Sequence, residues 1–174
     1  MDIAKMTQLI RDIPDFPQPG VLFRDITTVL RDPSAFRFAV DALAQRFKER
    51  DIDLVVGMES RGFIFGAPLA YILSAGFVPV RKKGKLPAET LSVEYALEYG
   101  SAELEIHKDA IQPGQKVLIV DDLLATGGTV GATIQLVESL GGQVSAVAFL
   151  IELGFFDGRS KIGPRYETIS IVQY

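Results

Sequence analysis

Short segments of mostly apolar residues, alternating with helical patterns, constrain the fold of this chain most strongly. Leu54–Gly57, Lys116–Val120 and Val144–Ile151 each have the length of a strand rather than of a helix. Strands that are apolar on both sides are typical of parallel sheets whose two faces are covered by helices. The sequence therefore predicts an α/β fold, a Rossmann-like parallel sheet with helices on both faces.

The spacing of apolar residues elsewhere in the chain predicts further helices and strands. Near the N-terminus, apolar residues from Ile3 to Ile13 have the spacing of an amphipathic helix. Arg81–Gly100 is polar and contains glycine, which predicts an irregular segment with room for hairpin strands. We also expect helices over Ser34–Arg50, Phe63–Ser74 and Val130–Leu140, and strands over Phe77–Val80 and Ile169–Val172.

Composition bounds the class of protein. With 174 residues, 48% of them hydrophobic, we expect a single domain over residues 1–174. The net charge of −4 argues against a nucleic-acid partner, because such binding requires a basic surface. The absence of cysteine excludes disulfides, thiolate nucleophiles and cysteine metal sites. No apolar run reaches the ~18 residues of a membrane span, and the N-terminus does not read as a signal peptide. We therefore expect a cytoplasmic protein with no membrane partner.

Three segments with unusual chemistry each follow a predicted strand. They are Met58–Gly62, Arg81–Lys85 and Asp121–Thr129. In parallel α/β sheets, ligands bind beyond the carboxyl ends of the strands. We therefore expect these three segments to meet at one edge of the sheet and to form one binding site.

The segment VLIVDDLLATGGT, residues 117–129, combines two carboxylates with a small glycine-rich loop. Thr126, Gly127, Gly128 and Thr129 allow an anion to approach backbone N–H groups at a helix N-terminus. Asp121 and Asp122 would repel a phosphate placed directly on them, but they suit sugar hydroxyls or a metal-bound sugar phosphate. An ordinary turn with a threonine N-cap is the alternative. Neither a Walker A loop nor a dinucleotide GxGxxG motif is present.

Two further segments carry positive charge. Glu59-Ser60-Arg61-Gly62 lies between a strand and a helix, so Arg61 could chelate a phosphate with its planar fork. A basic run follows the next strand and contains Arg81, Lys82, Lys83 and Lys85. A surface arginine and a solvated charge run are the alternatives at these two places. Together with the glycine-rich loop, they indicate a ligand that carries phosphate groups at both ends.

These segments together closely resemble the adenine phosphoribosyltransferases of the type I purine and pyrimidine phosphoribosyltransferase family. VLIVDDLLATGGT resembles the binding motif for 5-phosphoribosyl-1-pyrophosphate, and GMESRGF resembles the pyrophosphate loop, which in this family can carry a non-proline cis peptide. RKKGKLP and LEYGSAELEIHKDAI resemble the mobile loop, and PGVLFRDIT resembles the base-binding segment. The match is collinear from about Phe16 to Leu153. It implies a small N-terminal hood over about residues 1–30 and a mobile catalytic loop over about residues 82–106.

The resemblance also implies an activity: transfer of phosphoribosyl to adenine N9, which gives AMP and pyrophosphate with Mg²⁺. Asp121 and Asp122 would hold the ribose hydroxyls directly or through the metal shell, and residues from Ala125 to Thr129 would bind the 5-phosphate. Mg²⁺ would be held mainly by the substrate's pyrophosphate and ribose hydroxyls. Glu98 matches the family's candidate acid near adenine N7, beside Tyr99 as a substrate contact. The implied pyrophosphate ligands are Arg61, the backbone of Glu59 and Ser60, and Arg81, Lys82 and Lys85, some of them across a homodimer interface.

For the base, Leu22, Phe23, Arg24 and Leu153 match the family's adenine pocket. Ala125 disfavours the hypoxanthine–guanine relatives, which usually carry an aspartate at this position and use it near N7. Two other functions stay open at this stage. One is a phosphoribosyltransferase for another base, such as xanthine or a 6-substituted purine. The other is a non-catalytic sensor of phosphoribosyl pyrophosphate.

Overall fold

The computed structural model describes residues 1–96 and 101–174 of the chain. It divides into two compact units, Met1–Ala42 and Leu43–Tyr174. The first unit extends beyond the predicted hood of about residues 1–30, while the single-domain organisation stays a prediction. No helix within the described residues combines the length and apolarity that crossing a bilayer requires.

The first unit is built on a short antiparallel hairpin. It contains α1 (Ile3–Leu9), β1 (Arg11–Ile13), β2 (Phe23–Asp25), α2 (Thr27–Arg31) and the start of α3 (Pro33–Gln45). The N-terminal helix ends at Leu9, so its predicted extension to Ile13 is wrong. Ile10 adopts an extended conformation, and the following residues instead pair with β2, with Arg11 opposite Asp25.

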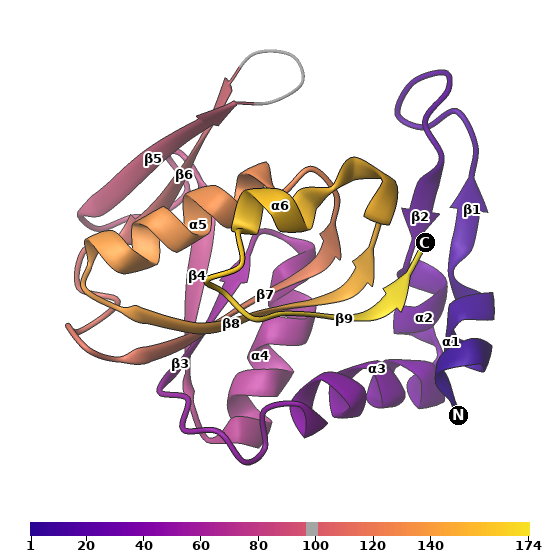
Figure 1. The fold of residues 1–174 in the computed structure, drawn as a ribbon, viewed down its shortest axis with the longest axis horizontal. Helices are drawn as coiled ribbons and strands as arrows, with labels where there is room; N and C mark the ends of the chain where they lie inside the picture. The colour runs from indigo at the N-terminus through magenta and orange to yellow at the C-terminus, as the bar shows by residue number, and fades with distance from the viewer. Residues whose placement is uncertain (97–100) are drawn as a thin grey trace. The chain divides into compact units, whose positions relative to one another are not determined.

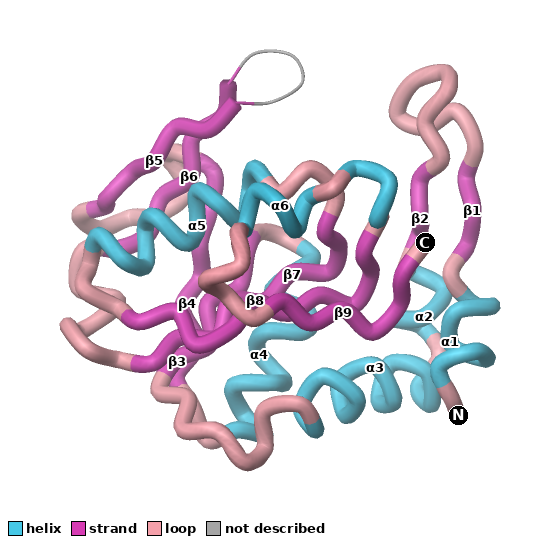
Figure 2. Tube along the Cα trace, in the orientation of Figure 1, coloured by secondary structure: helices cyan, strands magenta, loops and turns pink. Residues whose placement is uncertain are grey.

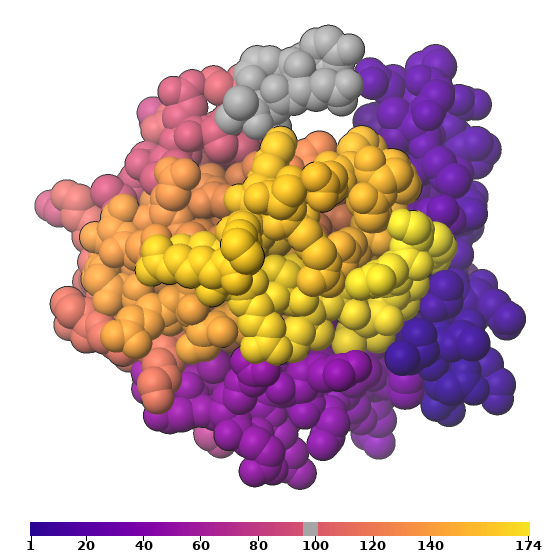
Figure 3. Space-filling model, in the orientation of Figure 1, coloured from indigo at the N-terminus to yellow at the C-terminus, as the bar shows by residue number. Residues whose placement is uncertain are grey.

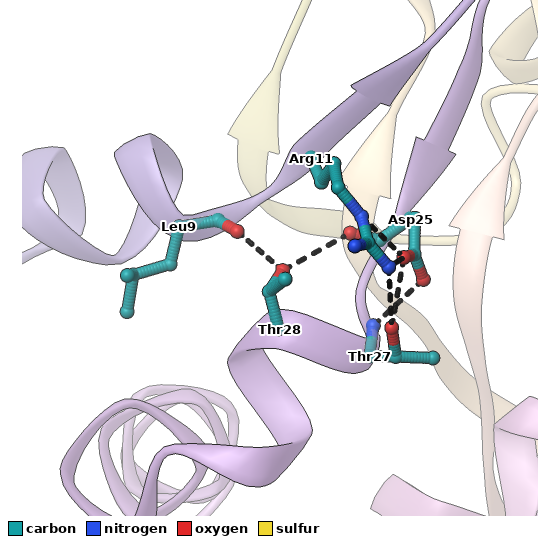
Figure 4. A network of polar contacts seen from close by, with 5 residues as sticks. All are labelled: Leu9, Arg11, Asp25, Thr27 and Thr28. Carbon is teal, nitrogen blue, oxygen red and sulfur yellow. Dashed lines mark hydrogen bonds and ion pairs between the residues drawn. The ribbon is translucent and has the colours of Figure 1, made fainter.

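A buried carboxylate fastens this hairpin to α2 (Figure 4). Asp25, only 7% exposed, accepts hydrogen bonds from Arg11 Nε at 3.0 Å and from the Thr27 N–H at 2.9 Å. The Thr28 hydroxyl donates to the carbonyl of Leu9 and so joins α1 to the same network. The backbone N–H of Thr27, with Arg11 and the Thr27 hydroxyl, holds the pKa of Asp25 below its ordinary value.

The second unit contains the central sheet. Its described strands are β3 (Leu54–Met58), β4 (Gly76–Lys82), β5 (Thr90–Ala96), β6 (Ser101–His107), β7 (Lys116–Leu124), β8 (Gln143–Glu152) and β9 (Thr168–Gln173). They form a sheet in the order β5-β6-β4-β3-β7-β8-β9. The five strands from β4 to β9 in this order are mutually parallel, which confirms the predicted α/β class.

Helices cover both faces of this sheet (Figure 1). α4 (Arg61–Leu73) lies on one face, against β3 and β7, while α5 (Gly128–Ser139) and α6 (Gly158–Ile162) lie on the other. A short 3-10 helix, Gly154–Phe156, precedes α6. Because β3 and β7 are neighbours whose following helices cover opposite faces, their carboxyl ends mark the switch point at which α/β sheets bind ligands.

The predicted segment Arg81–Gly100 proves more regular than its composition indicates. β5 and β6 pair antiparallel through seven residues, and β6 joins β4 antiparallel at Arg81 and Lys82 (Figure 2). The sheet is therefore mixed at this edge. Leu104 and Ile106 on β6 are buried in the core, which gives the hairpin an apolar face that fixes its register.

The predicted bounds of several other elements are also too short. β7 continues four residues past Val120 because it pairs with β8 as far as Leu124. α5 begins at Gly128 rather than Val130, and α4 begins at Arg61 rather than Phe63. In the opposite direction, α3 ends at Gln45, well before the predicted Arg50. Tertiary pairing and helix starts at glycine-rich turns are not visible in the apolar pattern alone.

We predict that Asp25→Asn destabilises the protein at neutral pH by about 1.5–3 kcal/mol, the usual range for losing a hydrogen bond to a charged group. Since the native pKa of Asp25 is lowered, its contribution is present above the ordinary carboxyl pKa and is lost as the pH falls through the native value. Thermal denaturation from pH 7 down to pH 3 should therefore show the two melting curves converging in acid. Asp41→Asn, on the exposed face of α3, is the control and should melt like the wild type at every pH.

Candidate active site

A cavity of about 320 Å³ opens at the carboxyl ends of β3, β4 and β7. It brings together parts of all three segments that the sequence analysis placed at one edge of the sheet. Most of its lining comes from the end of β7 and the loop that follows. The lining residues are Glu59, Ser60, Arg61, Lys82, Tyr95, Leu104, Phe149 and the continuous run from Asp121 to Val130.

The turn from β3 into α4 lies against the end of β7. The Glu59–Ser60 peptide is cis, and α4 begins directly afterwards at Arg61 with no side chain capping it at Ser60. A Cβ atom at Gly62 would lie 2.9 Å from Asp121 Oδ1 and 2.9 Å from the carbonyl oxygen of Val120. Only glycine therefore allows the helix N-terminus to approach β7 this closely.

The two adjacent carboxylates are held inside the end of β7. Asp122 is only 3% exposed, while Asp121 is partly open to the cavity. Arg61 Nε lies 2.8 Å from Asp122 Oδ2 and forms an ion pair. The groups are not aligned for a hydrogen bond, and no donor among the described residues makes one to that buried oxygen. The charge of this buried oxygen is therefore balanced by Arg61 rather than by an aligned hydrogen bond.

The protonation of the carboxylate pair reflects this burial. Burial and the neighbouring charge of Asp122 raise the pKa of Asp121 well above its ordinary value. Burial also raises the pKa of Asp122, but Arg61 opposes the shift. Asp121 Oδ1 accepts a hydrogen bond of 2.9 Å from the Asp122 N–H, which fixes its orientation. The pair is suited to hydroxyl donors or to a bound cation, either of which would relieve the repulsion.

The loop after β7 presents an uncapped helix N-terminus. Gly127, with φ of +80°, is the N-cap residue of α5, and no side-chain hydrogen bond occupies this cap. The alternative interpretation of this loop, a turn with a threonine N-cap, is therefore wrong. The first-turn N–H groups of a helix have no partner within the helix, and Thr126 and Thr129 line the cavity at this end of α5. An uncapped helix N-terminus of this kind can accommodate a phosphate-sized anion.

Glu59 binds three residues of the basic segment at the end of β4. Its buried carboxylate accepts from Arg81 Nε at 3.0 Å and from the Lys82 N–H at 3.1 Å, and it also pairs with Lys85 Nζ. Burial alone would raise the pKa of Glu59, but Lys85, the Lys82 N–H and Arg81 hold it below its ordinary value. Of the four basic residues predicted to bind pyrophosphate, Arg61 and Lys82 line the cavity, whereas Arg81 and Lys85 are not among its lining residues.

The other predicted site residues lie elsewhere or are not described. Leu22, Phe23 and Arg24 belong to the first unit, where Phe23 packs edge-on against Phe16 and Arg24 pairs with Asp12. Leu153 belongs to the second unit and is buried, with its N–H bonded to the Leu124 carbonyl. Glu98 and Tyr99 fall outside the described residues. The roles assigned to all of these residues stay predictions.

Three apolar or aromatic residues of the cavity were missed by sequence reasoning. Tyr95 and Leu104 come from the β5–β6 hairpin, whose register the sequence did not reveal. Phe149 lies opposite Asp121 in the β7–β8 pairing. Phe149 had a usable signal, because it lies near the carboxyl end of a strand predicted to be buried.

The fold and the site together define a class. An uncapped helix N-terminus, paired carboxylates and cationic residues lie around one cavity at the switch point, an arrangement that would suit a phosphorylated sugar with a second anionic group. Residues 26–173 match the phosphoribosyl transferase domain family, and the chain belongs to that family.

Similar proteins of known sequence or structure belong to one branch of this family, the adenine phosphoribosyltransferases. The chain is 57% identical to the adenine phosphoribosyltransferase of Thermoanaerobacter pseudethanolicus over all 174 residues, which is the full length of both chains. It superposes on the crystal structure of that enzyme with a TM-score of 0.96, covering 99% of each chain. The Saccharomyces cerevisiae adenine phosphoribosyltransferase, solved with an imino-altritol bisphosphate and adenine, is 43% identical with a TM-score of 0.91 and 97% of each chain covered.

We predict that Asp121→Asn stabilises the ligand-free protein. The raised native pKa means that ionised Asp121 costs folding free energy once the pH exceeds the ordinary carboxyl value. Removing the charge should raise the melting temperature at neutral pH by about 2–4 °C, which corresponds to roughly 1 kcal/mol for a chain of this size. Below the ordinary carboxyl pKa the gain should vanish. The control is Asp109→Asn at an exposed turn, and an equal melting temperature for Asp121→Asn and wild type at neutral pH would contradict the prediction.

Proposed function

We propose that this chain transfers the 5-phosphoribosyl group from 5-phosphoribosyl-1-pyrophosphate to adenine, giving AMP and pyrophosphate. The observation that carries the proposal is the single cavity in which the uncapped start of α5, the Asp121–Asp122 pair and Arg61 converge. The high identity to full-length adenine phosphoribosyltransferases supports adenine as the base.

The three parts of the cavity fit the three parts of the sugar substrate. Residues 125–129 bind the 5-phosphate through backbone N–H groups and the hydroxyls of Thr126 and Thr129. Asp121 and Asp122 accept from the ribose 2- and 3-hydroxyls. Arg61 and Lys82 face the pyrophosphate, with the backbone of Ser60 beside them. Arg81 and Lys85 act on this wall through Glu59, which holds both of them.

The reaction breaks the bond between ribose C1 and the pyrophosphate oxygen and forms a bond from C1 to adenine N9. Negative charge grows on the departing pyrophosphate, where Arg61 and Lys82 stabilise it. Positive character grows on the ribose, where the neighbouring carboxylates tolerate it. Because these charges are fixed before the substrate arrives, little reorganisation is needed during the step.

The residues present fit a role for Mg²⁺. Asp122 Oδ2 is buried with no aligned donor among the described residues, and burial and mutual repulsion raise the pKa of Asp121. Within the described residues no group of three or more potential ligands converges on one point, so the ion would be held mainly by the pyrophosphate and ribose hydroxyls. When bound, Mg²⁺ neutralises charge on the pyrophosphate.

The base is assigned to adenine on two grounds. Ala125 has no carboxylate to accept a hydrogen bond near N7, unlike the hypoxanthine–guanine relatives. The Giardia lamblia adenine phosphoribosyltransferase, 36% identical with a TM-score of 0.95, was solved with 9-deazaadenine. A homodimer and a cytoplasmic location complete the proposal, on the family resemblance.

A coupled assay of AMP formation tests the proposal directly. We expect turnover with adenine, and discrimination of about 10⁴–10⁵-fold against hypoxanthine, because a site that hydrogen-bonds its ligand rejects analogues by this factor. Turnover with hypoxanthine, xanthine or orotate in place of adenine would identify a transferase for another base. Tight binding of phosphoribosyl pyrophosphate without any AMP formation would identify a sensor.

We predict that the double variant Asp121→Asn, Asp122→Asn nearly abolishes transfer while the protein stays folded. The amides are isosteric, but they cannot balance the positive charge that develops on the ribose. Steady-state kcat/KM for AMP formation is the measurement, with circular dichroism as the check of folding. Near-normal kcat/KM in a folded double variant would contradict the role of the pair.

We predict that Glu98→Gln lowers kcat moderately, within the ~10²–10⁴-fold range of general acid–base catalysis. The resemblance assigns Glu98 to proton donation at adenine N7, and glutamine can donate only as an amide. The pH profile of kcat should lose the limb that reports this acid. An unchanged kcat and pH profile would argue against acid catalysis by Glu98, and Glu94→Gln on β5 is the matched control.

A further inference from the structure

The loop at residues 125–127 rests directly on the start of α6. A Cβ atom at Gly158 would lie 2.2 Å from the carbonyl oxygen of Ala125, so the backbones touch at this point. In return, a Cβ atom at Gly127 would lie 2.7 Å from the carbonyl oxygen of Gly158. α6 lies beside α5 on the same face of the sheet (Figures 1 and 3). The position of the loop therefore depends on the position of Gly158.

The residue after Gly158 anchors α6 to the sheet. Arg159 forms a bidentate ion pair with Glu152 at the end of β8. Its Nε donates to Oε1 at 2.6 Å, and its Nη2 donates to Oε2 at 2.6 Å. Its Nη1 donates to the carbonyl oxygen of Thr168 on β9 at 2.7 Å. Glu152 is 6% exposed, and Arg159 holds its pKa below the ordinary value. A bidentate pair of this kind fixes geometry as well as charge.

Glu152 also lies next to the base of the loop. It is the register partner of Leu124, the last residue of β7, and the neighbouring Leu153 N–H donates to the Leu124 carbonyl at 2.9 Å. Arg159 therefore links the strand beside the loop to the helix beneath the loop. The end of β7, the loop and α6 are therefore each in contact with the others, directly or through Arg159.

We propose that Arg159 is a positioning residue for the 5-phosphate loop, acting through Gly158 and Glu152. This inference rests on the proposed function, in which residues 125–129 bind the 5-phosphate. The start of α5 binds phosphate only if its N–H groups point at the anion, and a displacement of about 1 Å in a positioned group can cost about 10²-fold. The motifs to which the sequence comparison assigned roles end at Leu153, so no role was assigned to Gly158 or Arg159.

The test separates ligands that carry a 5-phosphate from ligands that do not. In Arg159→Ala we expect the KM for phosphoribosyl pyrophosphate and the dissociation constant of AMP to rise about tenfold or more, given the sensitivity of positioned groups. The KM for adenine and inhibition by free pyrophosphate should not change. Arg159→Lys keeps the charge but not the fork, and should give intermediate values.

A merely structural role would give a different result. It would lower the melting temperature and the active fraction, but it would leave the KM for every ligand unchanged. Arg165→Ala is the matched control, because Arg165 is 75% exposed in the same C-terminal segment and pairs with Glu138. It should behave as wild type.

Gly158→Ala tests the same contact without removing an ion pair. The added methyl group must displace the Ala125 carbonyl, so we expect the same selective loss of affinity for ligands that carry a 5-phosphate. If Arg159→Ala does not fold, this variant tests the inference in its place. Unchanged AMP affinity in folded Arg159→Ala or Gly158→Ala overturns the inference. A wild-type protein that neither forms nor binds AMP would instead overturn the proposed function.

Discussion

The burial of two adjacent carboxylates at the end of β7 is the constraint on which the rest of the site depends. Ionised carboxylates in a low-dielectric environment are costly unless a cation or hydrogen-bond donors compensate them. Arg61 compensates Asp122 only in part, since its Nε is close to Oδ2 without being aligned with it. Burial and the charge of Asp122 raise the pKa of Asp121, so hydroxyl donors or a cation placed beside the pair would relieve the repulsion.

This constraint also explains the close packing of α4 on β7. Arg61 can reach Asp122 only if the first turn of α4 lies against the strand, and a side chain at Gly62 would prevent that approach. The same approach places the start of α4 on the wall opposite the start of α5. Two helix N-termini from opposite faces of the sheet thus meet at one cavity, which follows from the reversal of strand order between β3 and β7.

Much of the site could be predicted because its residues follow strands directly in the sequence. Asp121, Asp122 and Arg61 each follow an apolar run, and the end of a parallel strand fixes where the next residues lie. The extension of β7 to Leu124 and the register of the β5–β6 hairpin could not be predicted, since both depend on which residues the strands pair with. The contact between Gly158 and the loop was equally hidden, because Gly158 follows the loop by thirty residues and lies in a five-residue helix with no distinctive pattern.

The basic residues around the end of β4 differ in their surroundings, although they are close together in the sequence. Arg81 and Lys85 both pair with the buried Glu59, whose single negative charge offsets part of their positive charge. Lys82 lies between them in sequence, yet it lines the cavity, and its backbone N–H donates to Glu59. A basic run that looks uniform in the sequence thus contains two residues paired with Glu59 and one residue, Lys82, that lines the cavity. Natural chains tend to leave local interactions incomplete at functional sites. Here the incomplete groups are Asp121, Asp122 and the first turn of α5, and all of them face the same cavity.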